Sequence, residues 1–295
     1  MIPTTEYDFD AIVVGSGISG GWAAKELTEQ GLKVLVLERG RDLQHGVGYT
    51  GEHAPSWKVP FNAKPDRKLE AEYYPVQSKS NAFRSTNRHF WNNDKDNPYA
   101  IDEGNPFEWY RGGAVGGRSL MWGRQTYRLS EQDFNANNQD GHGSPWPVSY
   151  SDIAPWYSYV EKFIGVNGKK EGLPQLPDGE FQKPMPWFAL EETIQGRLKK
   201  NAPDITLTNA RTAILTEDLP GRSACHYCGP CENGCSTGSY FSSQSSTLPA
   251  ARATNNLTLK SNAVVERLEY DKDSGKISKA HVVDANTMER STYSA

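Results

Sequence analysis

Four cysteines stand within eleven residues and form the densest group of metal-binding or redox-active side chains in the sequence: Cys225, Cys228, Cys231 and Cys235. Their spacing, C-x2-C-x2-C-x3-C, is the run found in bacterial ferredoxins, whereas zinc sites usually combine two cysteine pairs separated by a longer stretch. The pattern therefore favours an iron–sulfur cluster, preferably with four iron atoms. Three iron atoms, one or two local disulfides, zinc, and reduced structural thiols remain as alternatives.

A second group of residues that could do chemistry lies near the N-terminus, where Gly15, Gly17 and Gly20 form a G-x-G-x-x-G motif. In such a motif the first glycine allows a tight turn, the second lets the backbone approach a pyrophosphate, and the third lets a helix pack closely on a strand. Glu38 lies eighteen residues after Gly20, where a carboxylate can accept hydrogen bonds from ribose hydroxyls. We assign Glu38 and the adjacent Arg39 to the same nucleotide site.

The elements that must position this motif can be read from the flanking residues. An apolar β-branched run over residues 11–15 predicts a buried strand, a helical stretch extends through Leu27, and residues 33–38 predict a second strand. A strand, a helix and a strand that ends in an acid form a complete dinucleotide-binding βαβ unit. The acid disfavours a 2′-phosphate and hence NADP, but this unit alone does not distinguish NAD from FAD.

A second glycine-rich loop reads R-G-G-A-V-G-G-R-S-L-M-W-G. Small residues let the backbone lie flat against a planar ligand, although a glycine-rich surface turn is the plain structural alternative. From this loop we assign nine residues to cofactor binding: Arg111, Gly112, Gly116, Gly117, Arg118, Ser119, Met121, Trp122 and Gly123.

Together with the βαβ unit, this loop resembles the flavin-contacting signature of the glucose-methanol-choline (GMC) oxidoreductases, R-G-x-x-x-G-G-S-S-x-x-N-G. Arg118 replaces the first serine of the signature and Trp122 replaces its asparagine. Met121 stands where sugar-oxidising relatives of the pyranose oxidase branch carry a histidine that is bonded to the flavin. Because a thioether cannot form that bond, the resemblance implies noncovalent FAD.

The same resemblance extends towards the end of the chain. It implies that Val265 binds adenine through its backbone, and that residues 257–262, 263–270 and 276–284 are successive strands of a meander. The chain stops in what reads as a strand that returns to the FAD sheet. Relatives are about twice as long, and their catalytic histidine lies near the C-terminus, so we expect the N-terminal half of a longer enzyme with no catalytic residue in this chain.

The expected fold class is α/β, with a Rossmann-like FAD-binding domain of GMC type and an incomplete substrate domain. The expected organisation is a βαβ unit at 1–44, a loop-rich excursion or lid at 45–110, the flavin-contacting loop at 111–134, the start of the substrate domain at 135–222, the cysteine loop at 223–238, and a return to the FAD domain at 239–295. In the substrate part, residues 149–165 are expected to form a helix capped by Ser149.

Within the family the chain most resembles the branch of bacterial glucoside 3-dehydrogenases. The resemblance implies an FAD-dependent dehydrogenase that oxidises a secondary hydroxyl of a sugar or glycoside, with C3 as the candidate carbon, and passes electrons through the iron–sulfur cluster to an external acceptor. The alternative is a gluconate, polyol or other alcohol dehydrogenase or oxidase of the same family. An alternative from another functional class is a non-catalytic FAD-binding scaffold for electron transfer.

The resemblance also implies partners: a sugar or glycoside substrate, a small companion subunit and a cytochrome-type electron acceptor. Some related dehydrogenase subunits are exported together with such a companion, which places this chain in the periplasm; a cytoplasmic enzyme is the alternative. The N-terminal residues do not read as a secretory signal.

Composition agrees with a globular protein. The 295 residues exclude a mini-protein. The 32 basic and 36 acidic side chains give a net charge of −4, which does not indicate the excess of basic residues that nucleic-acid binding requires. No apolar run reaches the roughly 18 residues of a membrane span, so we expect no direct membrane insertion. The six histidines show neither metal-ligand spacing nor a catalytic motif: His45, His53, His89, His142, His226 and His281.

Overall fold

The computed structural model describes residues 8–295, which form two compact units. The first unit consists of the chain up to Trp122 together with Cys228–Gly238 and Ser242–Ala295. The second unit consists of Gly123–Tyr227 and Ser239–Phe241.

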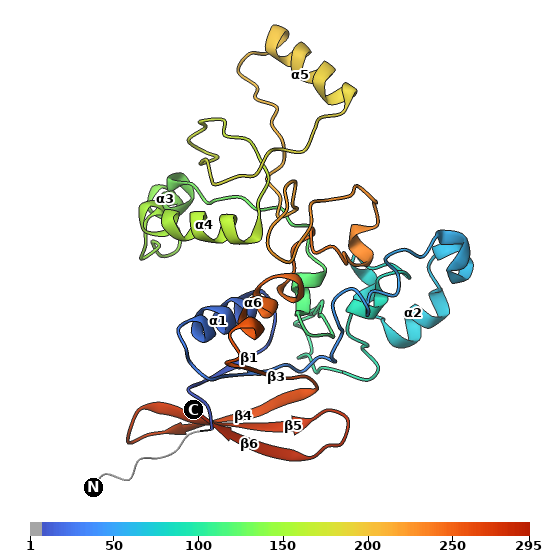
Figure 1. The fold of residues 1–295 in the computed structure, drawn as a ribbon, viewed down its shortest axis with the longest axis vertical. Helices are drawn as coiled ribbons and strands as arrows, with labels where there is room; N and C mark the ends of the chain where they lie inside the picture. Colours follow the sequence, from blue (N-terminus) through green and yellow to red (C-terminus); the bar gives the residue numbers. More distant parts are fainter. Residues whose placement is uncertain (1–7) are drawn as a thin grey trace. The chain divides into compact units, whose positions relative to one another are not determined.

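A three-stranded parallel sheet organises the first unit (Figure 1). Its strands, in the order β1-β2-β3, are Ala11–Val14, Val34–Leu37 and Leu257–Lys260. The central strand β2 is buried along its whole length, as its uninterrupted Val-Leu-Val-Leu sequence predicts. Two helices, α1 (Ile18–Glu29) and α6 (Thr247–Ala253), cover one face of the sheet, where Ala24 and Ala251 pack against Val34 and Val36.

An antiparallel three-stranded sheet covers the other face of the parallel sheet (Figure 1). Its strands are β4 (Ala263–Asp271), β5 (Lys276–Asp284) and β6 (Arg290–Ser294), in that order. The apolar layer between the two sheets joins Leu35 and Leu37 of β2 to Ala280 and Val282 of β5. The first unit is therefore a helix layer, a parallel sheet and an antiparallel sheet stacked in that order.

Two expectations about strand partners are wrong. The segment expected as the first meander strand, 257–262, forms β3 and pairs in parallel with β2. The C-terminal strand β6 pairs with β5 and not with the parallel sheet. The physical reason lies before β3: α6 supplies a helical crossover, which is the connection that parallel strands require.

The excursion between β2 and the second glycine loop contains little regular structure but has an aromatic core. Its only α-helix is α2 (Arg67–Tyr73), and its packing centre joins Phe83, Phe90 and Trp91 to Leu43, Tyr49, Ala114 and Leu120. The single-turn 3-10 helices of the first unit are Ser56–Lys58, Pro60–Ala63, Gln77–Lys79, Arg88–Phe90, Gly117–Leu120, Cys231–Asn233 and Ser243–Ser245.

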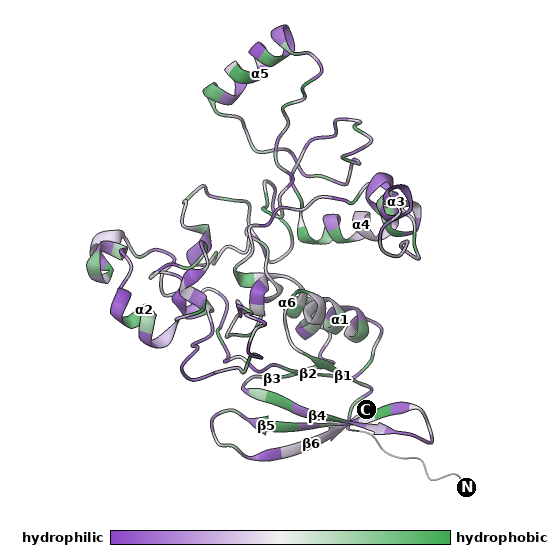
Figure 2. Cartoon of the chain, turned by 180° about the vertical axis from the view of Figure 1, so that it is seen from behind, coloured by the Kyte–Doolittle hydropathy of each residue, from purple (hydrophilic) through white to green (hydrophobic). Residues whose placement is uncertain are grey.

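The second unit contains α3 (Glu131–Asp140), α4 (Tyr150–Ile164) and α5 (Ala189–Asn201). The helix expected at 149–165 is confirmed, and Ser149 caps it in a capping box with Asp152. A buried ion pair between Arg128 and Glu161, 2.6 Å apart, anchors α4. No residue of α5 is buried, although green apolar bands alternate with purple polar ones along it (Figure 2).

Among the helices that the structure describes, none combines the length and the apolar character needed to cross a bilayer.

Candidate functional site

The first glycine loop connects β1 to α1 and has the backbone that its sequence predicts. Gly15 has a φ of +91°, a conformation that L side chains rarely adopt. A Cβ atom on Gly20 would lie 1.9 Å from the carbonyl oxygen of Gly15, so only glycine lets the helix start this close to the strand. At Gly17 nothing lies within 4 Å of a Cβ position, and this part of the loop is therefore open.

Glu38 is buried at the end of β2 and binds the first glycine loop directly. Its Oε2 accepts hydrogen bonds from the backbone N of Ser16 at 2.8 Å and from the Ser16 hydroxyl at 2.5 Å. Its Oε1 accepts a bond from the backbone N of Gly40 at 2.6 Å. Glu38 thus fixes the relative position of the loop and β2. Sequence reasoning identified Glu38 but missed its partner Ser16, which occupies the unspecified position of the glycine motif.

The second glycine loop lies against the first. The backbone N of Gly116 donates to the hydroxyl of Ser16 at 2.9 Å, and a Cβ on Gly117 would lie 3.5 Å from the Cα of Gly17. Gly116 and Gly117 both have positive φ. A Cβ on Gly112 would meet the backbone of Gly117 at 2.7 Å, so the loop is also folded tightly on itself.

A serine-rich segment before α6 completes this arrangement. The hydroxyl of Ser243 donates to the carbonyl of Gly17 at 3.0 Å, and its backbone N donates to the hydroxyl of Ser119 at 3.0 Å. The side chain of Gln244 donates to the carbonyls of Leu43 and Val115. We call the two glycine loops and residues 242–244 the loop cluster. Sequence analysis did not assign Ser243 or Gln244 to the site; their only signal is a run of small polar residues.

The loop cluster has the chemistry of an anion-binding site. It surrounds the start of α1, whose N-cap, Gly17, has no capping side chain and whose first turn contains no acidic residue. The first backbone N–H groups of a helix and its dipole favour a phosphate group at that position. Gly17 leaves open space beside them.

Three arginines assigned to the cofactor lie outside these contacts. Arg111 is buried, stacks on Tyr99 and Trp109 at 4.9 and 5.1 Å, and donates to the carbonyl of Asn97. Arg39 is exposed and donates to the side chain of Asn97, and Arg118 is exposed.

The other residues assigned to the cofactor lie at the end of the second glycine loop, at Met121, Trp122 and Gly123, and on β4, at Val265. Met121 packs against the aromatic core of the excursion. Trp122, half-buried, is the last residue of its segment in the first unit, and Gly123, exposed, is the first residue of the second unit. Val265 lies opposite Val282 and packs on the layer between the sheets, next to a register shift between Val265 and Arg267. That shift interrupts the regular pairing of the β4 backbone.

The cysteine loop is anchored to the excursion by its neighbours. The backbone N of Ser236 donates to Glu52 at 2.7 Å, and Thr86 donates to the side chain of Asn233 at 2.7 Å. Cys228 is exposed and the other three cysteines are half-buried. Within the residues that the structure describes, no three Cys, His, Asp or Glu side chains lie close enough together to hold a metal ion. Cys225 belongs to the second unit and the other three cysteines belong to the first.

Among the histidines, His89 has a strongly shifted pKa. Burial, together with the nearby Arg41 and Arg88 cations, lowers the pKa of His89 to about 4. His89 is therefore neutral near pH 7 and packs beside Phe90 in the aromatic core of the excursion.

Comparison with known proteins agrees with this geometry. Residues 10–83 match the protein family described as FAD dependent oxidoreductase. The large subunit of fructose dehydrogenase from Gluconobacter japonicus is 29% identical, over 61% of this chain and 31% of that protein. Paromamine 6'-oxidase from Streptomyces fradiae is 26% identical, over 90% of this chain and 42% of that protein. The gluconate 2-dehydrogenase flavoprotein from Pantoea cypripedii is 25% identical, over 95% of this chain and 48% of that protein.

Among solved structures, pyridoxine 4-oxidase from Mesorbium loti superimposes with a TM-score of 0.50 and 15% identity, over 97% of this chain and 48% of that one. The likeness confirms the α/β FAD-binding oxidoreductase fold. Residues 10–83, which contain the first glycine loop, are the part of the chain that matches FAD-dependent oxidoreductases. The chain spans less than half the length of the curated relatives given above.

Proposed function

We propose that the loop cluster binds FAD and that the whole protein is a dehydrogenase that oxidises a secondary hydroxyl of a sugar or glycoside, with C3 as the preferred carbon. The observation that carries the proposal is the meeting of both glycine loops at the uncapped start of α1 in a chain whose residues 10–83 match FAD-dependent oxidoreductases. Relatives named for fructose and gluconate support a sugar-like substrate.

The residues present fit the cofactor. The start of α1 and the open face at Gly17 would hold the pyrophosphate, and Glu38 would accept hydrogen bonds from the ribose hydroxyls. The second glycine loop would support the flavin, and Met121 has no group that could tether it covalently. When bound, FAD supplies the acceptor for the hydride of the substrate. The base that removes the hydroxyl proton is expected outside these 295 residues.

Gly17→Ala separates cofactor binding from folding. Because nothing lies within 4 Å of a Cβ at Gly17, the variant should keep its melting temperature without flavin, whereas the added methyl group should block the pyrophosphate and weaken FAD binding by at least about tenfold. Flavin absorbance per chain after dialysis measures the effect.

Two further alanine variants complete this experiment. Gly20→Ala should reduce stability as well as flavin content, because its Cβ would collide with the backbone of Gly15. Gly196→Ala in the exposed helix α5 is the matched control, with no atom within 4 Å; it should leave the flavin content unchanged and should not lower stability, because alanine favours a helix over glycine by about 1 kcal/mol. Full flavin content in the Gly17→Ala protein would contradict the proposed site.

Further proposals concern electron transfer, partner subunits and the cellular location of the protein. We propose that the cysteine run binds an iron–sulfur cluster, supported by the ligand type and spacing of Cys225, Cys228, Cys231 and Cys235. No step of the reaction is assigned to this cluster, because the described side chains are not gathered into a site. We also propose a small companion subunit, a cytochrome-type acceptor and a periplasmic location; a relative named as a large subunit supports the companion.

Iron and acid-labile sulfide in the anaerobically purified full-length protein test the cluster. We expect both elements together with visible absorbance, and we expect Cys228→Ser to reduce all three while flavin content is retained. A preparation that contains flavin but neither iron nor sulfide refutes the cluster and leaves the flavin site unaffected.

A further inference from the structure

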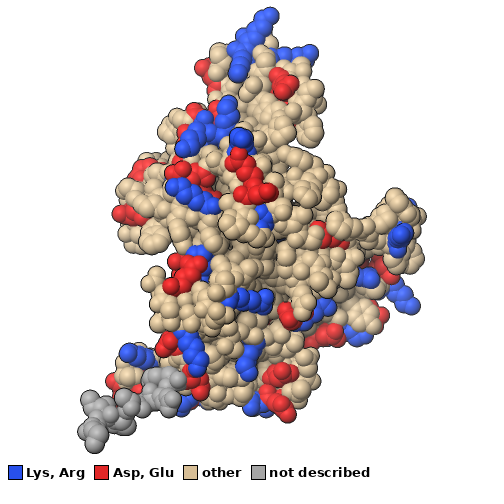
Figure 3. Space-filling view, in the orientation of Figure 1, with Lys and Arg blue, Asp and Glu red and all other residues tan. Residues whose placement is uncertain are grey.

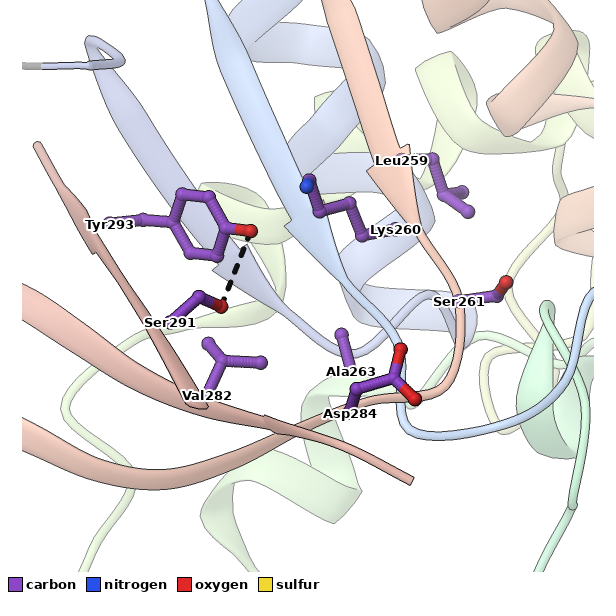
Figure 4. A pocket seen from close by; sticks show the side chains of 8 residues that line it. All are labelled: Leu259, Lys260, Ser261, Ala263, Val282, Asp284, Ser291 and Tyr293. Atoms are coloured by element: carbon purple, nitrogen blue, oxygen red, sulfur yellow. Dashed lines mark hydrogen bonds between the residues drawn. The ribbon is translucent and has the colours of Figure 1, made fainter. Parts of the chain in front are cut away.

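A pocket of about 320 Å³ lies in the first unit, where the end of β3 meets the antiparallel sheet (Figure 4). Ala263 and Val282 form its apolar floor, and polar side chains from β3, β5 and β6 surround it. The volume is large enough for a small organic molecule. None of the residues assigned above to FAD or metal binding lines this pocket, so the pocket is not part of the loop cluster.

One side of the pocket is cationic. The Lys260 ammonium lies 5.0 Å from the centre of the Tyr293 ring, and the Ser291 hydroxyl donates to the Tyr293 hydroxyl at 3.4 Å. Burial alone would raise the pKa of Tyr293, but hydrogen bonds from Lys260 and Ser291 lower it overall. Among the described residues, no carboxylate lies within ion-pair distance of Lys260. Its charge is therefore available to an anionic group in the pocket.

The other side of the pocket carries Asp284, whose carboxylate points into the cavity (Figure 4). The backbone N atoms of Thr287 and Asn286 donate to its Oδ1, and these bonds lower the pKa of Asp284. At neutral pH the side chain is a carboxylate, which accepts hydrogen bonds and repels anions. The pocket thus presents a cation with hydroxyl groups on one side and an acceptor on the other.

This arrangement selects against two simple kinds of ligand. A plain carboxylate would pair with Lys260 but would offer Asp284 nothing to accept. A neutral polyol would satisfy Asp284 but would leave the Lys260 ammonium without a counter-charge. We propose that the pocket binds a small polyhydroxylated carboxylate, whose carboxylate pairs with Lys260 and accepts a hydrogen bond from the Tyr293 hydroxyl, and whose own hydroxyl groups donate to Asp284.

Three four-carbon probes test this proposal on the flavin-loaded full chain by isothermal titration calorimetry. L-Threonate has the carboxylate and the hydroxyl groups, erythritol has only hydroxyl groups, and butyrate has only the carboxylate. We expect threonate to bind about tenfold or more tightly than either of the others, which is the effect of one charge-assisted hydrogen bond. Equal binding of the three probes, or no binding of threonate, overturns the proposal.

Variants locate the binding. Lys260→Gln and Asp284→Asn should each weaken threonate binding by about tenfold or more, whereas Lys276→Gln, an exposed lysine of β5 outside the pocket, should leave it unchanged. If Lys260→Gln reduces the melting temperature, Tyr293→Phe serves as the test variant instead, because Tyr293→Phe keeps the aromatic ring and removes only the hydroxyl. Flavin content should stay normal in all variants. Unchanged threonate affinity in both Asp284→Asn and the Lys260→Gln or Tyr293→Phe protein would place the ligand elsewhere and overturn the assignment.

Discussion

At the scale of single residues, the contact between Glu38 and Ser16 shows how the site is built. A carboxylate just after β2 was predicted to face a ribose; in the structure it accepts two hydrogen bonds from Ser16. The same serine hydroxyl accepts a bond from Gly116, 100 residues further along the chain. Glu38 and Ser16 together therefore connect β2 to both glycine loops.

Glu38→Gln tests this connection. An amide can accept at one oxygen only, so the change should leave one buried N–H donor of Ser16 or Gly40 without a partner, at a cost of about 1–3 kcal/mol. We expect a lower melting temperature and weaker FAD retention, measured by thermal denaturation and by flavin content after dialysis. Glu72→Gln is the control, because Glu72 forms an ion pair with Lys95 in which both side chains are exposed. If Glu38→Gln and Glu72→Gln behave alike, the Glu38 contacts do not hold the loop.

At the scale of elements, helix starts were recognised where a polar side chain can close the first turn. Ser149 and Asp152 exchange bonds at the start of α4, with the Ser149 backbone N 2.8 Å from the Asp152 carboxylate. Ser130 and Asp133 make the same capping box at α3, which was not predicted because that helix has a single buried apolar residue, Phe134. Capping signals alone therefore indicate where a helix can begin, and an apolar face is needed to indicate how far it extends.

Ser149→Ala should destabilise the second unit by about 1 kcal/mol, through loss of the cap, and Ser149→Thr should restore most of that stability. Hydrogen bonds from the Ser149 side chain and backbone lower the pKa of Asp152. A lowered folded-state pKa stabilises the protein above the usual Asp range and loses this effect as the pH falls through the folded-state pKa. The difference between wild type and Ser149→Ala in chemical denaturation should therefore be smaller at acid pH than at pH 7. An equal difference at both pH values would show that the carboxylate has no part in the cap.

At the scale of the whole chain, distant segments build the first unit. Ser16, Gly116 and Ser243 come from three separate stretches of sequence, and all three contribute to the loop cluster. Lys and Arg side chains are interspersed with Asp and Glu over the face drawn in Figure 3, in agreement with the small net charge of −4. Such a surface offers no long-range electrostatic field that would by itself select a partner.

Local sequence was sufficient for features that depend on neighbours along the chain. The strands at 11–15 and 33–38 were predicted from short buried apolar runs, and the structure has them at Ala11–Val14 and Val34–Leu37. The glycine motif predicted the tight turn at Gly15 and the close approach at Gly20, because both follow from the absence of a Cβ atom. The strand at 276–284 was also predicted with the bounds that the structure shows.

Tertiary structure alone decided which segments became partners. Alternation of apolar residues shows that a segment can form a strand but does not identify its neighbour, so the pairing of β3 with β2 and of β6 with β5 could not be read from residues 257–294. The roles of Ser243 and Gln244 were hidden for the same reason, since a small polar residue acquires a role only when a distant backbone is brought to it. The pocket beside Lys260 likewise exists only because four strands, β3 to β6, meet there. Sequence by itself determined the tight turn at Gly15 and the strands on either side of the glycine loop, whereas long-range packing determined the loop cluster and the pocket.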